Sequence, residues 1–279
     1  MQHGKPSRTA LRVAIRRAAH QLVDRPPVLD DPIAVRLIGS GYKRDLERAS
    51  HTVARDFRSF MAARSRYAED HLAQAVAAGV RQYVVLGAGL DTFAYRNPFP
   101  QLHVFEVDFP ATQEWKRWML SEAGIGSPAN LTSVALDFER QTLADGLRCA
   151  GFDAAAPAFF SWLGVVSYLT LDAFRATLAA IGSLAAGSGI AFDYPAPPDT
   201  LTPQRRALFD RLAGRLAASG EPFRLFFMPE QIEAELRNAG FHRTEHADYD
   251  QLNQLYFRDR ADGLKLSPVG IGMLATGWV

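Results

Sequence analysis

The sequence predicts an α/β fold in which a mostly parallel sheet follows a helical layer. Up to about Val80 the chain is alanine-rich, with arginines spaced among apolar residues, which is typical of helices. After Val80, apolar runs of four to seven residues alternate with longer helical or polar segments, as in parallel sheets. The length of 279 residues, with 48% hydrophobic content, allows one large core and a smaller accessory layer.

Residues 1–80 are expected to form an N-terminal helical lid segment, and residues 81–279 a core domain. Prolines interrupt the lid segment at Pro26, Pro27 and Pro32. Seven apolar runs in the core have the length of strands, at residues 83–86, 102–107, 131–136, 158–163, 189–193, 241–247 and 271–276. Helices are expected between several of them, at residues 110–122, 171–186 and 229–239. This alternation predicts a seven-stranded sheet with helices on both faces.

A long connection at residues 195–228 interrupts the alternation. It has a proline-rich start and a helical stretch at residues 203–218. Connections of this length usually have a function, such as covering a binding site. We therefore expect a helical lid insertion here, in addition to the N-terminal helices.

The first predicted strand leads directly into a Gly-x-Gly turn formed by Gly87 and Gly89. Glycine lacks a Cβ, so the chain can turn sharply and a cofactor can approach the backbone closely. The next strand ends in two acids, Glu106 and Asp108, at about the distance of 20 residues where a carboxylate accepts from ribose hydroxyls. This order predicts a Rossmann-like sheet with a nucleoside-containing cofactor. The alternative is that the glycines simply close a tight strand-to-helix turn.

Two features favour S-adenosylmethionine over a dinucleotide at this turn. Dinucleotide enzymes have a third glycine where this chain has Thr92. Pro98 also stops the following helix early, which leaves little room for a helix N-terminus that faces a pyrophosphate. S-adenosylmethionine has no phosphate and needs close backbone approach, a ribose acceptor and partners for its amino-acid end. A nicotinamide-dependent oxidoreductase and a catalytically silent cofactor-binding protein remain as alternatives.

Seven short motifs distributed along the chain resemble those of one family. They are SRTA from Ser7, DDPIA from Asp30, AARSRYAED from Ala62, LGAGLDTFAYR from Leu86, FEVDFP from Phe105, LDFE from Leu136 and SWLGVVSYLT from Ser161. Together they resemble the bacterial relatives of leucine carboxyl methyltransferase, which are class I methyltransferases. Some members of that family methylate polyketide or other small-molecule carboxylates and hydroxyls. The resemblance therefore implies an S-adenosylmethionine-dependent O-methyltransferase with a small-molecule acceptor.

The resemblance also implies roles for individual residues. Arg64 would pair with the cofactor carboxylate, and Gly87 would lie against the methionyl part. Asp108 would hold the ribose, while Asp137 and Phe138 would face the adenine. These roles suit the chemistry, because a guanidinium binds a carboxylate in a fork and an acid can accept from the adenine amino group.

The acceptor and the catalytic residues are less evident in the sequence. Where many relatives have a glutamate in the fourth-strand motif, this chain has Leu163, so the substrate of the eukaryotic enzyme, a protein carboxyl terminus, is not carried over. Tyr168 and Tyr194 lie at or just beyond the ends of the fourth and fifth strands, where ligands bind to open sheets. Either tyrosine is a candidate substrate contact, with core packing as the alternative. A carboxylate acceptor needs no general base, whereas a phenol would benefit from one.

Two other patterns have competing interpretations. Asp91 either caps the short helix at Thr92 or contacts the cofactor. The HRTEH segment from His242 to His246 has a zinc-peptidase spacing, but it is expected to be a strand, in which the two imidazoles lie too far apart to share a metal. We therefore predict no metal site.

Charge and cysteine content limit the partners and the compartment. The chain has 31 Lys and Arg against 30 Asp and Glu, which gives no electrostatic reason to expect nucleic acid or an anionic membrane. The single cysteine, Cys149, excludes an internal disulfide, is expected to pack, and fits a reducing cytoplasm. No signal-peptide pattern or long apolar window is present. A cytoplasmic protein without a membrane or nucleic-acid partner is expected, and its oligomeric state is not indicated.

Overall fold

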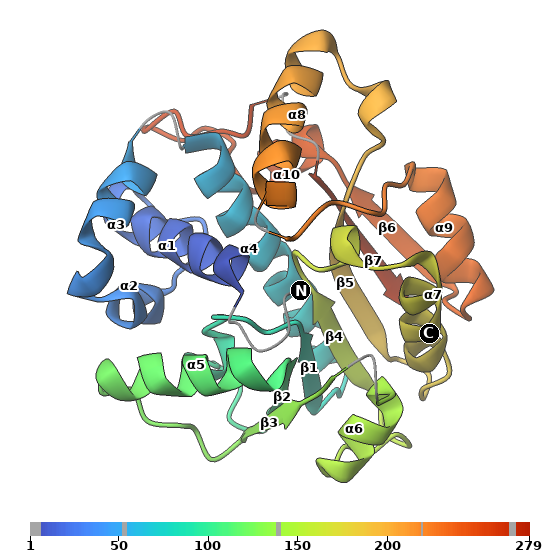
Figure 1. The fold of residues 1–279 in the computed structure, drawn as a ribbon. Helices are drawn as coiled ribbons and strands as arrows, with labels where there is room; N and C mark the ends of the chain where they lie inside the picture. Colours follow the sequence, from blue (N-terminus) through green and yellow to red (C-terminus); the bar gives the residue numbers. More distant parts are fainter. Residues whose placement is uncertain (1–6, 52–54, 138–140, 219, 268–271) are drawn as a thin grey trace.

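A seven-stranded sheet forms the centre of the protein. The computed structural model, drawn in Figure 1, describes residues 7–51, 55–137, 141–218, 220–267 and 272–279. The strands lie in the order β3-β2-β1-β4-β5-β7-β6. Their bounds are β1 Gln82–Leu86, β2 His103–Asp108, β3 Leu131–Ala135, β4 Ala158–Trp162, β5 Gly189–Pro195, β6 Arg243–Ala247 and β7 Gly272–Trp278. β7 is antiparallel to both of its neighbours, and the other pairings are parallel. The predicted α/β fold is confirmed.

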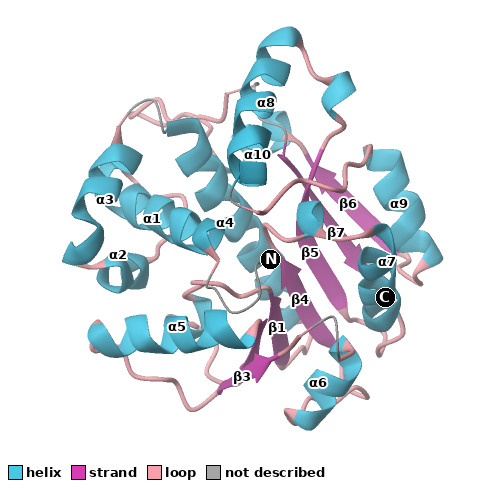
Figure 2. Cartoon of the chain, viewed as in Figure 1, coloured by secondary structure: helices cyan, strands magenta, loops and turns pink. Residues whose placement is uncertain are grey.

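Helices lie on both sides of the sheet, as Figure 2 shows. They are α1 Arg8–Val23, α2 Pro32–Ile38, α3 Lys43–Ser50, α4 Arg55–Ala77, α5 Pro110–Glu122, α6 Leu143–Cys149, α7 Leu171–Gly182, α8 Pro203–Ala218, α9 Pro229–Asn238 and α10 Tyr249–Tyr256. α5 and α8 have the predicted bounds. Within the described residues, no helix combines the length and apolarity that crossing a bilayer requires.

Residues of the resemblance motifs begin two of the N-terminal helices. The Ser7 side chain accepts a hydrogen bond from the third backbone N–H of α1, and the Asp31 side chain does the same for α2. Pro32 follows Asp31 as the first residue of α2, where its missing N–H costs no hydrogen bond. The sequence predicted a break near Pro32, and the structure shows that this break is a capped helix start.

The central strands of the sheet are buried on both faces, which we name after the helices that cover them. On the α7 face, Val84, Phe160 and Phe192 pack against α6, α7 and α9. On the α4 face, Val85 and Phe159 pack against α4. Alternate residues of a strand point to opposite faces, so the long apolar runs of the sequence are explained by burial on both sides.

Two features depart from the sequence-based expectation. α6 and α10 were not predicted, because helices of seven and eight residues carry too few turns for a clear apolar period. Cys149, expected to pack, is exposed. α6 turns Leu143 and Leu147, four residues apart, toward the core, and this orientation leaves Cys149 in solvent.

Candidate cofactor site

The glycine turn after β1 has a backbone that only glycine adopts readily. Gly87 has a φ of 64° and Gly89 a φ of 49°. A Cβ on Gly87 would lie 2.4 Å from Cγ2 of Val165, and a Cβ on Gly89 would lie 2.9 Å from Cβ of Ala10. The turn is therefore closely covered by the loop after β4 and by α1. Both glycines are required by geometry as well as by backbone conformation.

Asp108, the last residue of β2, is tied to this turn. Its Oδ2 accepts from the Gly89 N–H at 2.5 Å, and its Oδ1 accepts from the Phe109 N–H at 2.6 Å. Burial raises the pKa of Asp108 against the effect of these two backbone donors, which favour the carboxylate. The structure thus brings together Gly87, Gly89 and Asp108 at the carboxyl edge of the sheet.

Glu106, the other acid of this strand, has a different environment. Its Oε2 lies 2.5 Å from Nζ of Lys116 on α5, and both side chains are about 4% exposed. Burial raises the pKa of Glu106, and the nearby ammonium opposes that shift. Of the two acids that the sequence offered at this strand tip, Asp108 is therefore the one joined to the glycine turn.

Arg64 on α4 reaches the same edge of the sheet from the α4 face. Its Nη1 donates to Oδ2 of Asp193 at 2.8 Å, and both side chains are about nine-tenths buried. Gly164 N–H donates to the other oxygen of Asp193. A Cβ on Gly164 would lie 3.1 Å from both terminal nitrogens of Arg64. Gly164 lies against Arg64, and the next residue, Val165, packs on Gly87. Arg64 and the glycine turn therefore belong to one site.

Asp91 accepts from the first N–H of the short 3-10 helix Phe93–Tyr95 and also forms an ion pair. Its Oδ1 accepts from the Phe93 N–H at 2.8 Å, and its Oδ2 lies 2.6 Å from Nη1 of Arg17 on α1. Burial disfavours the carboxylate, but the charges of Arg17, Lys116 and Arg96 outweigh this effect and lower the pKa of Asp91 to about 2. The N-cap position of this helix is occupied by Thr92, so Asp91 contributes a hydrogen bond to the Phe93 N–H beside it, and a cofactor contact of Asp91 stays a prediction.

A buried charge network, missed by sequence reasoning, joins the N-terminal helices to the glycine turn. Arg17 Nη2 lies 2.7 Å from Oδ2 of Asp31 and donates to Oγ1 of Thr92 at 2.9 Å. Thr92 donates to Oδ1 of Asp31 at 2.7 Å. Arg96 donates two hydrogen bonds to Glu69 and lies 3.4 Å from Asp31.

The members of this network come from three of the motifs behind the family resemblance, together with Arg17. Asp31 belongs to DDPIA, Glu69 to AARSRYAED, and Thr92 and Arg96 to LGAGLDTFAYR. We call Arg17, Asp31, Glu69, Asp91, Thr92 and Arg96 the N-terminal charge network. In this chain the network docks the N-terminal helices on the glycine turn.

Asp137 follows β3 and lies near Asp108, because the N–H of Leu136 donates to the backbone oxygen of Asp108 at 3.0 Å. The backbone oxygen of Asp137 accepts from the Gln141 N–H at 2.9 Å. Phe138 lies outside the described residues. The structure therefore places one of the two residues predicted to face the adenine beside the residue predicted to hold the ribose.

The two candidate tyrosines have different surroundings. Tyr168 ends the 3-10 helix after β4, and its ring stacks on Phe223 of the insertion, with 5.6 Å between ring centres. Burial, helped by the charge of Glu221, raises the pKa of Tyr168 to about 12. Tyr194 is 1% exposed on the α7 face, and its hydroxyl lies 3.1 Å from Nδ1 of His246. The charges of Arg64 and Asp193 act on Tyr168 with opposite effects on its pKa.

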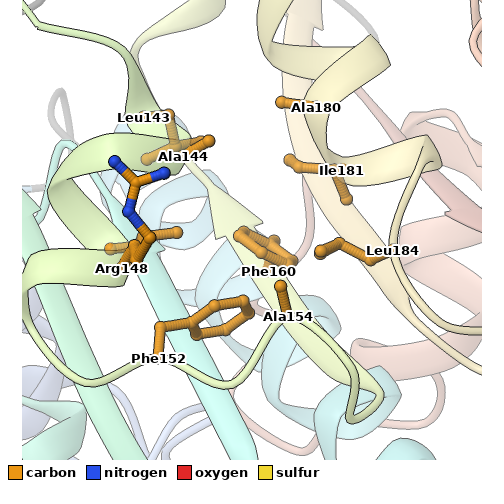
Figure 3. Close-up of a pocket in the computed structure, with 10 residues that line it drawn as sticks. Leu143, Ala144, Arg148, Phe152, Ala154, Phe160, Ala180, Ile181 and Leu184 are labelled. Atoms are coloured by element: carbon orange, nitrogen blue, oxygen red, sulfur yellow. The ribbon is translucent and has the colours of Figure 1, made fainter.

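A cavity elsewhere in the fold is a poor match for this cofactor. It has a volume of about 170 Å³. Figure 3 shows residues that line it, which come from α6, α7 and the segment around β4. Apolar side chains line most of it, including Phe152, Phe160 and Ile181. Phe152 precedes β4, so the cavity extends toward the amino end of that strand, away from the glycine turn. The carboxyl edge of the sheet remains the candidate site.

Known proteins are similar in sequence to this chain over the segments that form the site. A family model described as leucine carboxyl methyltransferase matches residues 10–182. The chain belongs to the leucine carboxyl methyltransferase family. YktD of Bacillus subtilis (strain 168) is 32% identical over 291 residues, which cover 95% of each chain. A relative in Mycobacterium avium (strain 104) is 37% identical over 219 residues, covering 74% of this chain and 72% of its own. The names of both relatives place them among S-adenosyl-L-methionine-dependent methyltransferases.

Solved structures share the fold of this family member. A methyltransferase from Thermobifida fusca YX has a TM-score of 0.60 at 20% identity, with 99% of this chain and 96% of that chain covered. A DUF574 family protein from Streptomyces avermitilis has a TM-score of 0.53 at 16% identity, with 94% and 96% covered. At these identities the two structures support the fold alone.

Family membership and the relatives make this chain an S-adenosylmethionine-dependent methyltransferase, and they do not support the nicotinamide alternative. The carboxyl edge fits the cofactor on two observations. The positive-φ glycine turn brings its backbone beside the Asp108 carboxylate, which accepts from the Gly89 N–H. Nε of Arg64 is buried and has no hydrogen-bond partner among the described residues, so the guanidinium has a donor available for a ligand.

Proposed function

We propose that the protein methylates an oxygen of a small-molecule acceptor, a carboxylate or a hydroxyl, with natural products such as polyketides among the candidates. The observation that carries this proposal is the position of Tyr168, which ends the 3-10 helix after β4 and stacks on Phe223 of the insertion; like any phenol, it is protonated at neutral pH. A protonated phenol donates a hydrogen bond but does not remove a proton. The site therefore suits an acceptor oxygen that is already anionic, and a carboxylate fits best.

When bound, S-adenosylmethionine supplies a methyl group on a positively charged sulfur. In the proposed site, Asp108 accepts from the ribose hydroxyls, and the N–H groups of Gly89 and Phe109 fix the orientation of its carboxylate. Arg64 binds the carboxylate of the methionyl end through donors that Asp193 does not use.

The remaining cofactor contacts follow the family resemblance. Gly87, whose Cβ side is covered by Val165, lies against the methionyl part through its backbone. Asp137, next to the end of β3, accepts from the adenine amino group, and Phe138 covers the ring. Together these contacts would hold the adenosyl group against the tips of β1, β2 and β3.

The N-terminal helices and the insertion at residues 195–228 are proposed to cover this site and exclude water, as in-line methyl transfer requires. α1 already contacts the glycine turn through Ala10. Ser7 and Thr9, at the start of the same helix, donate hydrogen bonds to Glu221 in the insertion. The two proposed lids thus touch each other above the carboxyl edge.

Calorimetric titration with S-adenosylhomocysteine tests the cofactor contacts. Asp108→Ala is expected to weaken binding at least about tenfold, because buried hydrogen bonds to a charged acceptor are strong. Arg64→Ala is expected to weaken binding as well, while a decarboxylated analogue binds both proteins equally. Arg66→Ala is the matched control, since Arg66 lies on the same helix but is 48% exposed and pairs with Asp70. Unchanged affinity in Asp108→Ala would show that the ribose assignment is wrong.

Labelled S-adenosylmethionine tests the acceptor class. The protein is incubated with panels of small carboxylic acids, phenols and aliphatic alcohols, and the labelled products are separated. Methyl esters are expected to form faster than ethers at neutral pH. If no panel yields product although the cofactor binds, the catalytically silent alternative is favoured.

A further inference from the structure

Asp193 is a buried acid at the cofactor edge that the proposed function does not use. It lies in β5 between Phe192 and Tyr194, which face α7, so Asp193 points to the α4 face. Its side chain is 11% exposed. One carboxylate oxygen accepts from Arg64 and the other from the Gly164 N–H. Burying a charge is costly, so an acid held this firmly next to a proposed ligand-binding arginine calls for an explanation.

The pairing leaves one side of the Arg64 guanidinium without a partner among the described residues. Asp193 takes a donor on Nη1, while Nε is buried and has no partner among the described residues. A guanidinium presents its donors in a rigid plane, so a second carboxylate can bind on the Nε side while Asp193 stays in place. The two side chains therefore present a cation and an anion next to each other.

The amino-acid end of the cofactor has the complementary pattern. At neutral pH it carries a carboxylate and an ammonium group on one carbon atom, so both must find partners in a small space. Arg64 can bind the carboxylate, and the adjacent Asp193 is the acid placed to accept from the ammonium.

We propose that Asp193 binds the ammonium group of the cofactor's methionyl end and holds Arg64 in position for the carboxylate. The proposal rests on the cofactor role of Arg64 in the proposed function. Both contacts lie where β4 and β5 end, beside the glycine turn. Asp193 is thus a binding residue for one charged group and a positioning residue for the partner of the other.

The sheet register gives independent support. Trp162 of β4 pairs with Phe192 of β5 in parallel, so the next residues, Leu163 and Asp193, are at the same level on adjacent strands. Leu163 packs against the apolar cluster of the α4 face, the face to which Asp193 points. Many relatives have a glutamate where this chain has Leu163. Here the acid at this level of the sheet is Asp193, on the adjacent strand β5.

The test compares two ligands by calorimetry: S-adenosylhomocysteine and its deamino analogue, in which hydrogen replaces the ammonium group. The wild-type protein is expected to bind the deamino analogue about 10- to 100-fold more weakly, which is the range for a buried charged hydrogen bond. Asp193→Asn is expected to bind S-adenosylhomocysteine with a similar loss, and to bind the two ligands within about threefold of each other. Thermal unfolding of each variant confirms that it is folded.

The possible outcomes separate this inference from the proposed function. If the wild-type protein binds both ligands equally, or if Asp193→Asn weakens both to the same extent, the ammonium role is wrong. If the wild-type protein binds neither ligand, the proposed cofactor site itself fails. The wild-type comparison needs no variant, so equal binding of the two ligands by the wild-type protein overturns the inference even if Asp193→Asn misfolds. A second variant, Leu163→Glu with Asp193→Asn, is expected to recover at least part of the preference for S-adenosylhomocysteine.

Discussion

The two segments proposed as lids are attached to the sheet by different chemistry. The N-terminal helices meet the glycine turn through the N-terminal charge network, in which Arg17 and Asp31 are almost fully buried. The insertion instead meets the loop after β4, where Phe223 stacks on Tyr168 and the Arg224 N–H donates to the backbone oxygen of Ser167 at 2.7 Å. The ion pair within α8, between Arg206 and Asp210, is exposed to solvent.

These contacts indicate which of the two proposed lids is held in a more strictly defined position. A buried charge network holds its members in a defined geometry, because any displaced charge would lose its partner in a medium of low polarity. Stacked rings at a partly exposed surface are less directional, and they separate at a smaller free-energy cost. We therefore expect the N-terminal helices to stay fixed on the glycine turn and the insertion to be the part that opens.

The largest effect is expected from breaking the N-terminal charge network. Arg17→Met leaves the carboxylates of Asp31 and Asp91 buried with less compensation, so the free energy of unfolding should fall by about 3–5 kcal/mol. Urea unfolding followed by circular dichroism measures this. The matched control is Arg206→Met in the insertion, which removes an exposed pair and should change the free energy by less than about 1 kcal/mol. Similar losses in both variants would contradict the comparison.

A smaller and local effect is expected in the insertion. Phe209→Ala removes a ring that packs on Phe223 and Phe226, and it should lower the opening free energy of α8 by about 2 kcal/mol. Amide hydrogen exchange should then be roughly 30-fold faster in α8, while exchange in β1 and β4 stays unchanged.

Phe57→Ala is the matched control for this measurement, because Phe57 lies in the N-terminal layer and is 39% exposed. It should leave exchange in α8 as it is in the wild-type protein. If Phe209→Ala accelerates exchange throughout the sheet, α8 is part of the core unfolding unit and does not open alone.

The smallest effect concerns pH. His246 pairs with Tyr194 near the point where the insertion leaves β5, and burial lowers the pKa of His246, while Glu233 and Glu230 oppose this shift. A lowered folded-state pKa means that His246 stabilises the fold fully above the unfolded pKa of about 6.5, and that this contribution is lost as the pH falls below it. Asp91, with a pKa of about 2, stays charged throughout this range.

Lowering the pH from 7.5 to 5.5 should therefore reduce stability by less than about 1 kcal/mol through His246, and His246→Asn should lack this part of the pH dependence. Thermal unfolding at a series of pH values measures it. An unchanged pH profile in His246→Asn would remove His246 as the cause.

Much of the fold could be predicted because the relevant signals are local. The strands have apolar runs bounded by glycine, proline or polar residues, and α8 begins at Pro203 as its sequence indicated. Of the proposed cofactor contacts, Gly87 and Asp108 were placed by a strand, a turn and a second strand that are adjacent in the sequence. Such features depend on neighbouring residues, so a pattern in the sequence reveals them.

The remaining parts depend on contacts between distant residues. Arg64 pairs with Asp193, which lies 129 positions later, and Arg17 contacts Thr92, which lies 75 positions later. Nothing in the sequence around Asp193 distinguishes it from a surface acid after an apolar strand. The family resemblance identified Arg64 as a site residue, but only the fold shows which acid accompanies it.

The position of β7 has a consequence for how the chain is made. β7 is synthesised after β6, yet it lies between β5 and β6 and pairs with both (Figure 1). Ala247 therefore leaves the ribosome before the strand that joins β6 to the rest of the sheet, roughly 2 to 6 seconds earlier at typical elongation rates. During that interval β5, which already carries Asp193 and the start of the insertion, presents an open edge to other proteins. Chaperone contact with the nascent chain is expected to matter most in this short period.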